Sequence, residues 1–325
     1  MPQDIISENQ ISKVAEVLKI PEDEAGIFLK KAYAGGDVFG LSFEEWFEQR
    51  FRPFVYFLDQ NDYAMMLVDA LKIIATTAGT DYGSSRQRDL AQLWADMTRG
   101  YLGELAFVKF LSDKFAIEAK LAHERGVLKD FLPLDVAEVR TKNNSNWRKP
   151  KQKIAIKTTK WNGIWFDIPG DQFNHSDIHV MVKVGVGRDS LIAYLKSISV
   201  FRDKVLKEGV AVGSLTKEES EKLYNELPSF KPVPAYIAGF VSRDGKYAPL
   251  SYSGIKGRIH FKVNSWNGPI RSSDLIEIKK TQGLGETGQI IFEGIEKFAH
   301  SSGYLFNTGS LLWKIDDWKE HLKFL

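Results

Sequence analysis

Residues 153–160 read KIAIKTTK and give the first indication of the fold of this chain. Apolar and polar residues alternate in it, which predicts a β-strand, because successive side chains of a strand point to opposite faces. Ile154 and Ile156 then face one way. Ala155 and Lys157 face the other way, so the strand is expected to have one apolar face and one face that carries a lysine.

The same strand ends the most basic segment of the chain. Residues 140–160 carry eight positive charges and no acid, although the net charge of the whole chain is only +2. The basic residues are Arg140, Lys142, Arg148, Lys149, Lys151, Lys153, Lys157 and Lys160. A local field of this kind attracts a polyanion such as nucleic acid. A solvated loop is the alternative interpretation. The residues upstream of the run favour the binding of nucleic acid.

Two acidic residues precede the strand. Glu104 falls in the apolar stripe of a helix predicted over residues 84–115, so its carboxylate is expected to be buried. Burying a charge is costly unless it is paired, either with an interior Arg or Lys or with a metal ion. Asp135 opens a strand predicted over residues 134–139, twenty residues before Ala155.

A helical Glu, an Asp at the start of a strand and a Lys on the next strand resemble, in this order, the PD-(D/E)xK nuclease superfamily. The resemblance spans roughly residues 95–245. It implies a restriction-endonuclease-like α/β (α+β) fold, with a mixed central sheet flanked by helices. It also implies a Mg²⁺-dependent, sequence-specific endonuclease of the type II restriction class, which hydrolyses phosphodiester bonds in double-stranded DNA. A structure-specific or repair nuclease of the same superfamily is the alternative.

The resemblance also implies roles for individual residues. Asp135 and Glu104 would hold Mg²⁺, since this hard cation prefers oxygen ligands. Lys157 would orient or activate the attacking water. The family has Asp or Glu where this sequence has Ala155, so the second metal-binding acid is missing.

Three explanations of Ala155 stay open. An acid-to-alanine variant that inactivates a nuclease is favoured, because every neighbouring feature is present. Alternatively, Glu138 or Asp167 could supply the acid from another position, and Glu138 could also replace Glu104 as the carboxylate that assists the metal. The third explanation is a catalytically dead subunit that binds DNA.

Contacts to DNA are expected from the basic run and from two polar loops. Cationic side chains contact phosphates whatever the sequence, whereas polar side chains on loops can read bases. The expected DNA-binding residues are Arg140, Lys142, Asn144, Arg148, Lys149, Lys151, Lys160, Trp161, Asn162, Asn267 and Arg271. By analogy with enzymes that cut palindromic sites, a homodimer is expected. A cognate DNA methyltransferase would act on the same DNA sequence without binding to this protein.

The rest of the chain is divided into three predicted regions. Residues 1–90 form a helical region, residues 91–245 the nuclease core, and residues 246–325 a β-rich region that could recognise DNA. The predicted helices include residues 42–57, 62–76, 217–227 and 288–299. The predicted strands include residues 163–168, 178–186, 191–198, 235–241 and 275–280.

Composition and local motifs exclude several other classes. The absence of cysteine removes disulfide scaffolds, thiolate zinc sites and thiol nucleophiles. The amino-terminal residues have no basic signal-peptide region, so a cytoplasmic protein is expected. His175 and His179 are four residues apart but lack a third zinc ligand. The GxGxxG at residues 283–288 is interpreted as a glycine turn, since too few residues follow it for a Rossmann sheet.

Overall fold

The centre of the protein is a mixed four-stranded sheet. The structure, a computed structural model, describes residues 6–77, 89–123, 135–141, 144–245, 250–251, 260–263, 270, 272–285, 288–292, 302–323 and 325. The strand order is β1-β8-β7-β5. β5 (Ile154–Lys160) runs parallel to β7 (Ile178–Val184), whereas β8 (Val233–Ser242) runs antiparallel to both β7 and β1 (Val55–Leu58). The predicted mixed sheet in an α/β fold is confirmed.

Burial explains why the two central strands read as apolar runs. Every residue of β7 and β8 is buried, so these strands are covered on both faces and need no alternation of polar and apolar residues. β5 lies at an edge of the sheet, and its residues become more exposed from Lys157 onward. Burial in β5 therefore decreases along the strand and does not alternate between its two faces.

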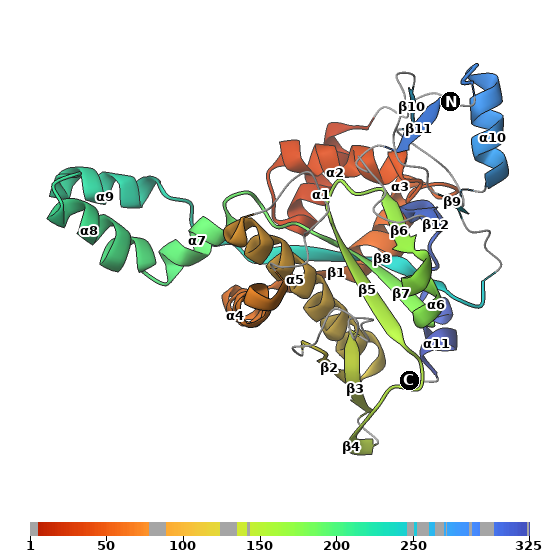
Figure 1. Cartoon of the computed structure of the whole chain (residues 1–325), viewed down its shortest axis with the longest axis horizontal. Helices are drawn as coiled ribbons and strands as arrows, with labels where there is room; N and C mark the ends of the chain where they lie inside the picture. Colours follow the sequence, from red (N-terminus) through yellow and green to blue (C-terminus); the bar gives the residue numbers. More distant parts are fainter. Residues whose placement is uncertain are drawn as a thin grey trace.

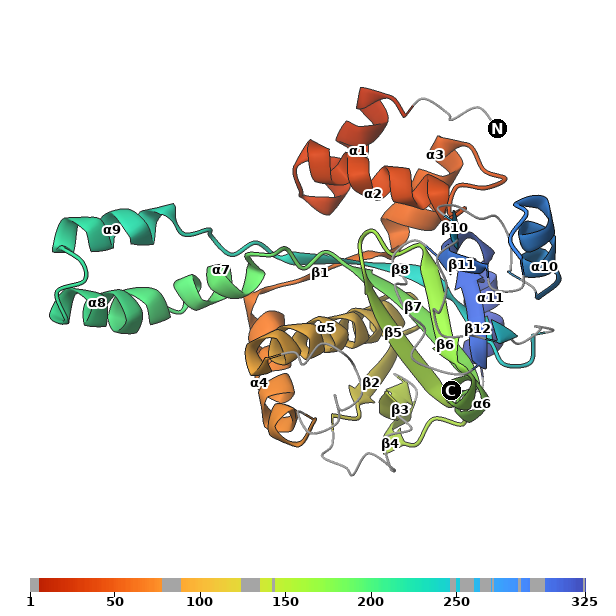
Figure 2. The ribbon, with the colours of Figure 1, turned by 45° about the horizontal axis from the view of Figure 1, so that its top comes forward.

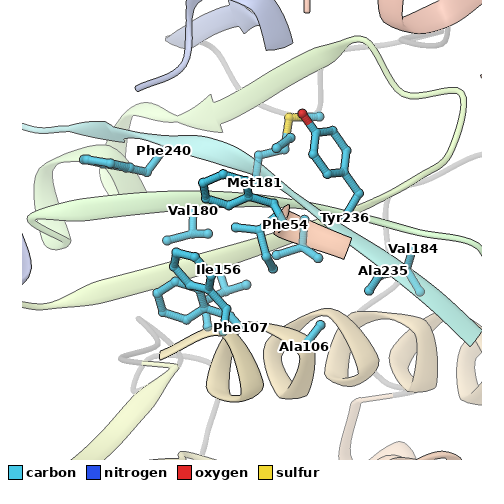
Figure 3. Packing of buried hydrophobic residues seen from close by; sticks show 14 of the residues in the cluster. Phe54, Ala106, Phe107, Ile156, Val180, Met181, Val184, Ala235, Tyr236 and Phe240 are labelled. Atoms are coloured by element: carbon cyan, nitrogen blue, oxygen red, sulfur yellow. The ribbon is translucent and has the colours of Figure 1, made fainter. Parts of the chain in front are cut away.

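Helices cover both faces of this sheet (Figure 1). α4 (Gln60–Thr77) and α5 (Leu90–Phe115) lie on one side, and α1 (Glu8–Leu18), α2 (Glu22–Ala34) and α3 (Phe43–Glu45) lie on the other (Figure 2). Figure 3 shows Ala106 and Phe107 of α5 packed beneath Ile156 and Val180 of the sheet. Tyr236 projects from the opposite face, where its ring meets those of Phe28 and Phe51.

Three smaller sheets surround the central one. β2 (Ile117–Leu121), β3 (Val136–Thr141) and β4 (Asn144–Arg148) form an antiparallel sheet. β12 (Ser302–Asn307) pairs with β6 (Trp165–Pro169) and β9 (Leu250–Ser251), and β10 (His260–Val263) pairs with β11 (Gln289–Phe292). The remaining helices are η1 (Trp46–Phe51), η2 (Arg52–Phe54), α6 (Gly170–His175), α7 (Ser190–Ser197), η5 (Phe201–Leu206), α8 (Lys207–Ala211), α9 (Lys217–Glu226), α10 (Ser272–Thr281), η6 (Thr308–Ser310) and α11 (Ile315–Leu322).

All three predicted regions contribute to one hydrophobic core. Phe51 comes from the amino-terminal region, Phe110 from the middle region and Trp318 from the carboxy-terminal region, and all three are completely buried in the same cluster. The rings of Phe110 and Trp318 are 4.9 Å apart. The carboxy-terminal region also adds β12 to the edge of β6, which lies in the middle region. Contacts between distant parts of the chain therefore hold the fold together.

Several predicted elements have the wrong type. Residues 191–197 and 275–280, which belong to the strands expected over 191–198 and 275–280, lie in the helices α7 and α10. The start of the helix expected over residues 288–299 is the strand β11, and residues 293–299 lie outside the described part. Each of these runs is short, and periodicity over so few residues does not separate a strand from a helical turn.

The helix expected over residues 42–57 is also interrupted. It begins as predicted with a capping box between Ser42 and Glu45. Pro53 then lies in a short 3-10 turn, and the chain continues as strand β1. A proline inside a helix removes a backbone hydrogen bond and clashes with the preceding turn, which accounts for the change.

Candidate active site

Asp135 lies directly beside Ala155 at the edge of the central sheet. The backbone N–H of Asp135 donates to the carbonyl oxygen of Ile154 at 3.1 Å. Its side-chain carboxylate accepts a hydrogen bond from the backbone N–H of Ile156. These two bonds lie on either side of Ala155, so Asp135 occupies the place that a neighbouring strand would take. The two positions at which the resemblance expects metal-binding acids are therefore adjacent.

The surroundings of Asp135 disfavour the ionised form of its own carboxyl group. Burial raises the pKa of Asp135 well above its ordinary value, and the charge of Glu104 raises it further. The hydrogen bond from Ile156 and the charge of Lys157 oppose this rise in pKa. Two neighbouring carboxyl groups in a buried place favour the uptake of a proton or a cation, since like charges at short range cannot both ionise freely.

Close packing of α5 against β5 brings Glu104 into this group. The hydroxyl of Thr158 donates to the carbonyl oxygen of Gly100 at 2.9 Å. A Cβ atom at Gly103 would lie only 1.9 Å from Oγ1 of Thr158, so a glycine is required for this approach. The buried face of α5 runs through Leu102, Ala106 and Phe110. Glu104 lies at the margin of that face, and its side chain is only 12% exposed, in agreement with the predicted burial of its carboxylate.

Glu104 is paired with a histidine, not with the Arg or Lys that the sequence analysis considered. Nε2 of His123 lies 2.9 Å from Oε2 of Glu104, and Nδ1 of His123 lies 3.1 Å from Oδ2 of Asp69 on α4. The imidazole stacks on the ring of Tyr101, with the ring centroids 3.8 Å apart. All three polar side chains are at most 20% exposed.

The pKa values reflect this arrangement. Burial raises the pKa of Glu104, and the hydrogen bond and charge of His123 oppose that rise. Burial alone would lower the pKa of His123, but the hydrogen bonds and charges of Glu104 and Asp69 outweigh it, so that the pKa is raised.

Sequence reasoning gave no role to Asp69, Tyr101 or His123. Asp69 interrupts an apolar helix, which is a local signal of a buried polar partner. His123 follows strand β2 without any motif, and only its position in space connects it with the two carboxylates.

Lys157 lies on the polar face of β5. Its ammonium group donates to the carbonyl oxygen of Asp167 on β6 at 3.1 Å. Burial lowers the pKa of Lys157 to about 8, although the charges of Asp167 and Asp135 oppose the decrease. An amine with a pKa near neutrality can give up and take back a proton, which suits the role in water activation that the resemblance implies.

His179 is the residue of β7 that pairs with Ala155 in the sheet. It is completely buried, it stacks on Phe173 at 5.1 Å, and Nε2 lies 3.2 Å from the carbonyl oxygen of Phe173. Burial lowers its pKa to about 4, so the imidazole is neutral at physiological pH. His175 ends helix α6. Within the described residues, no three His, Asp or Glu side chains are grouped to hold a metal ion.

The residues at the edge of β5 fit part of a magnesium site. Asp135 and Glu104 offer oxygen atoms, and Mg²⁺ is commonly bound by one or two carboxylates together with water and substrate phosphate. The raised pKa values of both groups mean that a cation would relieve their repulsion. Ala155 adds no donor, so the set is one carboxylate short of the family pattern.

The two alternative acids have different surroundings. Glu138 on β3 pairs with Lys120 at 2.7 Å and is 40% exposed. Asp167 on β6 lies near Lys157, as its effect on the pKa of that lysine indicates. Asp167 is therefore the better placed of the two to act together with Lys157.

The predicted DNA-binding residues fall into three groups. Arg140 pairs with Glu118, and the guanidinium of Arg148 donates to the backbone oxygen of Leu325, so both arginines make contacts within the protein. Trp161 packs its ring on Phe28 at 5.0 Å. The exposed members are Lys149, Lys151, Lys160 and Asn162. Lys142, Asn267, Arg271 and the side chain of Asn144 lie outside the described residues.

Comparison with protein families, with curated proteins and with solved structures found no match for this chain. No helix in the described part of the chain has the length and apolar character needed to cross a membrane.

Proposed function

We propose that this chain has the architecture of a Mg²⁺-dependent endonuclease for double-stranded DNA, similar to type II restriction enzymes, with one metal-binding acid missing at Ala155. The proposal rests above all on one observation: Asp135 is hydrogen-bonded on both sides of Ala155, with Glu104 and Lys157 close enough to act on its pKa. These residues come from separate parts of the chain.

Each residue has a defined part in the proposed hydrolysis. Asp135 and Glu104 would hold the cation, which when bound polarises the phosphate and lowers the pKa of a bound water. Lys157 would take the proton of the attacking water, because its own pKa is about 8. The water oxygen forms a bond to phosphorus as the bond between phosphorus and a sugar oxygen breaks, and the released sugar oxygen takes up a proton from solvent water. The exposed Lys149, Lys151 and Lys160 would contact phosphates of the duplex.

The lack of a donor at Ala155 favours a second candidate, a catalytically inactive subunit that still binds DNA. The exposed lysines beside β5 would serve this function without any change. The two candidates differ only in whether a carboxylate at position 155 produces cleavage.

The test is a nuclease assay on matched variants. The chain, Ala155→Glu and Ala155→Gln are each incubated with phage or plasmid DNA, once with Mg²⁺ and once with EDTA. Ala155→Gln has the size of the glutamate variant without its charge. Discrete fragments from Ala155→Glu alone, in Mg²⁺ alone, are expected, and Asp135→Asn in the same background should abolish them.

Other outcomes have distinct meanings. Cleavage by all three proteins, lost on Asp167→Asn, would mean that Asp167 supplies the second acid. Tight DNA binding without cleavage by any of them would support the inactive subunit. Neither cleavage nor binding would refute the nuclease proposal.

A further inference from the structure

The imidazole of His123 is fixed from three directions. Nε2 lies 2.9 Å from Oε2 of Glu104, and Nδ1 lies 3.1 Å from Oδ2 of Asp69. Its face lies on the ring of Tyr101, with the centroids 3.8 Å apart and an angle of 21° between the planes. A buried carboxylate needs only one partner to be paired. A partner that is itself held at both nitrogens and on one face also fixes where that carboxylate lies.

Asp69 is held at both of its oxygens. Oδ2 faces His123, and Oδ1 pairs with Lys72 at 2.7 Å, one turn further along α4. α4 is joined to α5, because the indole nitrogen of Trp94 donates to the carbonyl oxygen of Leu67 at 2.7 Å (Figure 2). The contacts that end at the Glu104 carboxylate therefore begin on a different helix from the one that carries it.

The segment that carries His123 is also joined to Asp135. The backbone N–H of Ala122 donates to the carbonyl oxygen of Asp135 at 3.1 Å. On its other side, Asp135 is hydrogen-bonded to β5. His123 directly follows Ala122, so the partner of Glu104 lies one residue from a backbone contact with Asp135. The two carboxylates that would bind a cation are thereby held relative to each other.

Glu104 can contact His123 and a cation at the same time. The histidine faces Oε2, and an ionised carboxylate has two oxygens with about four lone-pair sites. Tyr101 lies close to the same acidic groups: burial raises its pKa, and the charges of Glu104 and Asp69 raise it further. Residues behind a metal ligand orient it, and their loss typically weakens metal binding roughly 10- to 100-fold.

We propose that Asp69, His123 and Tyr101 are positioning residues for the cation ligand Glu104. This inference rests on the proposed function, because it takes Asp135 and Glu104 as the ligands of the cation. It goes beyond that function by giving a role to three residues outside the nuclease pattern. They would not touch the cation or the DNA, and they act by keeping Glu104 in place beside Asp135.

Binding of Mn²⁺ to the whole chain tests this proposal without any nuclease activity. Mn²⁺, like Mg²⁺, prefers oxygen ligands, and electron paramagnetic resonance measures the free ion. Tyr101→Leu removes the stacked ring without changing any charge and should raise the dissociation constant for Mn²⁺ roughly 10-fold. Tyr101→Phe keeps the ring and should bind Mn²⁺ as the unchanged chain does. Circular dichroism should show that every variant is folded.

Replacement of the histidine gives the second comparison. His123→Ala should weaken Mn²⁺ binding roughly 10- to 100-fold, although it removes a group that repels cations when it is protonated. His123→Gln offers an N–H donor again and should recover part of the affinity. In the background of Glu104→Gln, which itself should weaken binding, Tyr101→Leu and His123→Ala should have no further effect, because they act through Glu104.

Equal losses of affinity with and without Glu104→Gln would overturn the proposal, since they would reveal a general structural role. Unchanged or tighter Mn²⁺ binding by Tyr101→Leu and His123→Ala would also overturn it, if Asp135→Asn still weakens binding. A failure of the proposed function has a different signature. If neither Asp135→Asn nor Glu104→Gln changes Mn²⁺ binding, the cation site is refuted, and this inference with it.

Discussion

Both ring nitrogens of His123 face carboxylate oxygens, with Nε2 lying 2.9 Å from Glu104 and Nδ1 lying 3.1 Å from Asp69. Only a doubly protonated imidazole can donate to both, and the raised pKa of His123 agrees with that state. A buried carboxylate at the margin of α5 is thereby paired without any Arg or Lys. The arrangement also holds the Glu104 side chain at a definite position next to Asp135.

Removal of the histidine should be costly because Glu104 would lose its partner in a buried place. We expect His123→Ala to lower the free energy of unfolding by about 1–3 kcal/mol at pH 7. In the background of Glu104→Gln the same substitution should cost less, since Asp69 is then the one carboxylate that loses the histidine, and Asp69 also pairs with Lys72. Urea denaturation of the four proteins of this double-mutant cycle measures the difference, and strictly additive losses would contradict the pairing.

Lys157 should make stability depend on pH in the alkaline range. Its pKa is about 8 in the folded protein and near 10.5 when exposed, so the unfolded chain binds more protons between these values. Stability from this group therefore rises with pH from about 8 to 10.5. Lys157→Met should stabilise the protein by about 1–3 kcal/mol at pH 7 and by much less at pH 10.5. The exposed Lys160→Met is the control, and an equal pH profile for both variants would argue against a buried ammonium.

The Asp135 carboxylate accepts a hydrogen bond from Ile156 and also places a negative charge next to Glu104, and two substitutions separate these effects. Asp135→Asn keeps an acceptor for the N–H of Ile156 and removes a charge next to Glu104, so we expect unchanged or slightly higher stability at pH 7. Asp135→Ala leaves that N–H without its acceptor and should cost about 1–3 kcal/mol. Thermal unfolding of both variants checks this, and a larger loss for Asn than for Ala would be inconsistent with the hydrogen bond.

Two glycines of α5 should respond in opposite ways to alanine. Gly103→Ala would place a methyl group against Thr158 and should destabilise the protein by about 1–3 kcal/mol through overpacking. Gly100→Ala meets no atom within 4 Å and should stabilise by about 0.5–1 kcal/mol, because alanine favours the helix. Denaturation midpoints compare the two directly. Equal effects would mean that α5 does not approach β5 as closely as described.

Local patterns were sufficient for several elements and for part of the candidate site. The alternation of residues 153–160 predicted β5, and a charged helical pattern predicted α9, because these signals depend only on neighbours along the chain. The resemblance to the nuclease superfamily, and not periodicity, selected Asp135, Lys157 and Glu104 as candidate site residues. The types of α7, α10 and β11 were wrong, since a short apolar run suits either a strand or a helix until its packing partners are known.

Periodicity, which is a local property of the chain, was enough to predict a mixed α/β protein, whereas the resemblance to a nuclease superfamily pointed to the three residues around Ala155. Only the tertiary structure brought Asp69 and His123 to Glu104, and tied Arg148 to Leu325 instead of leaving it for DNA. Apart from Asp69, which interrupts an apolar helix, these residues carry no local signal of partners that lie 19 to 177 residues away along the chain. Their contacts are decided by how α4, α5 and the strands pack around one core, and packing depends on the whole chain.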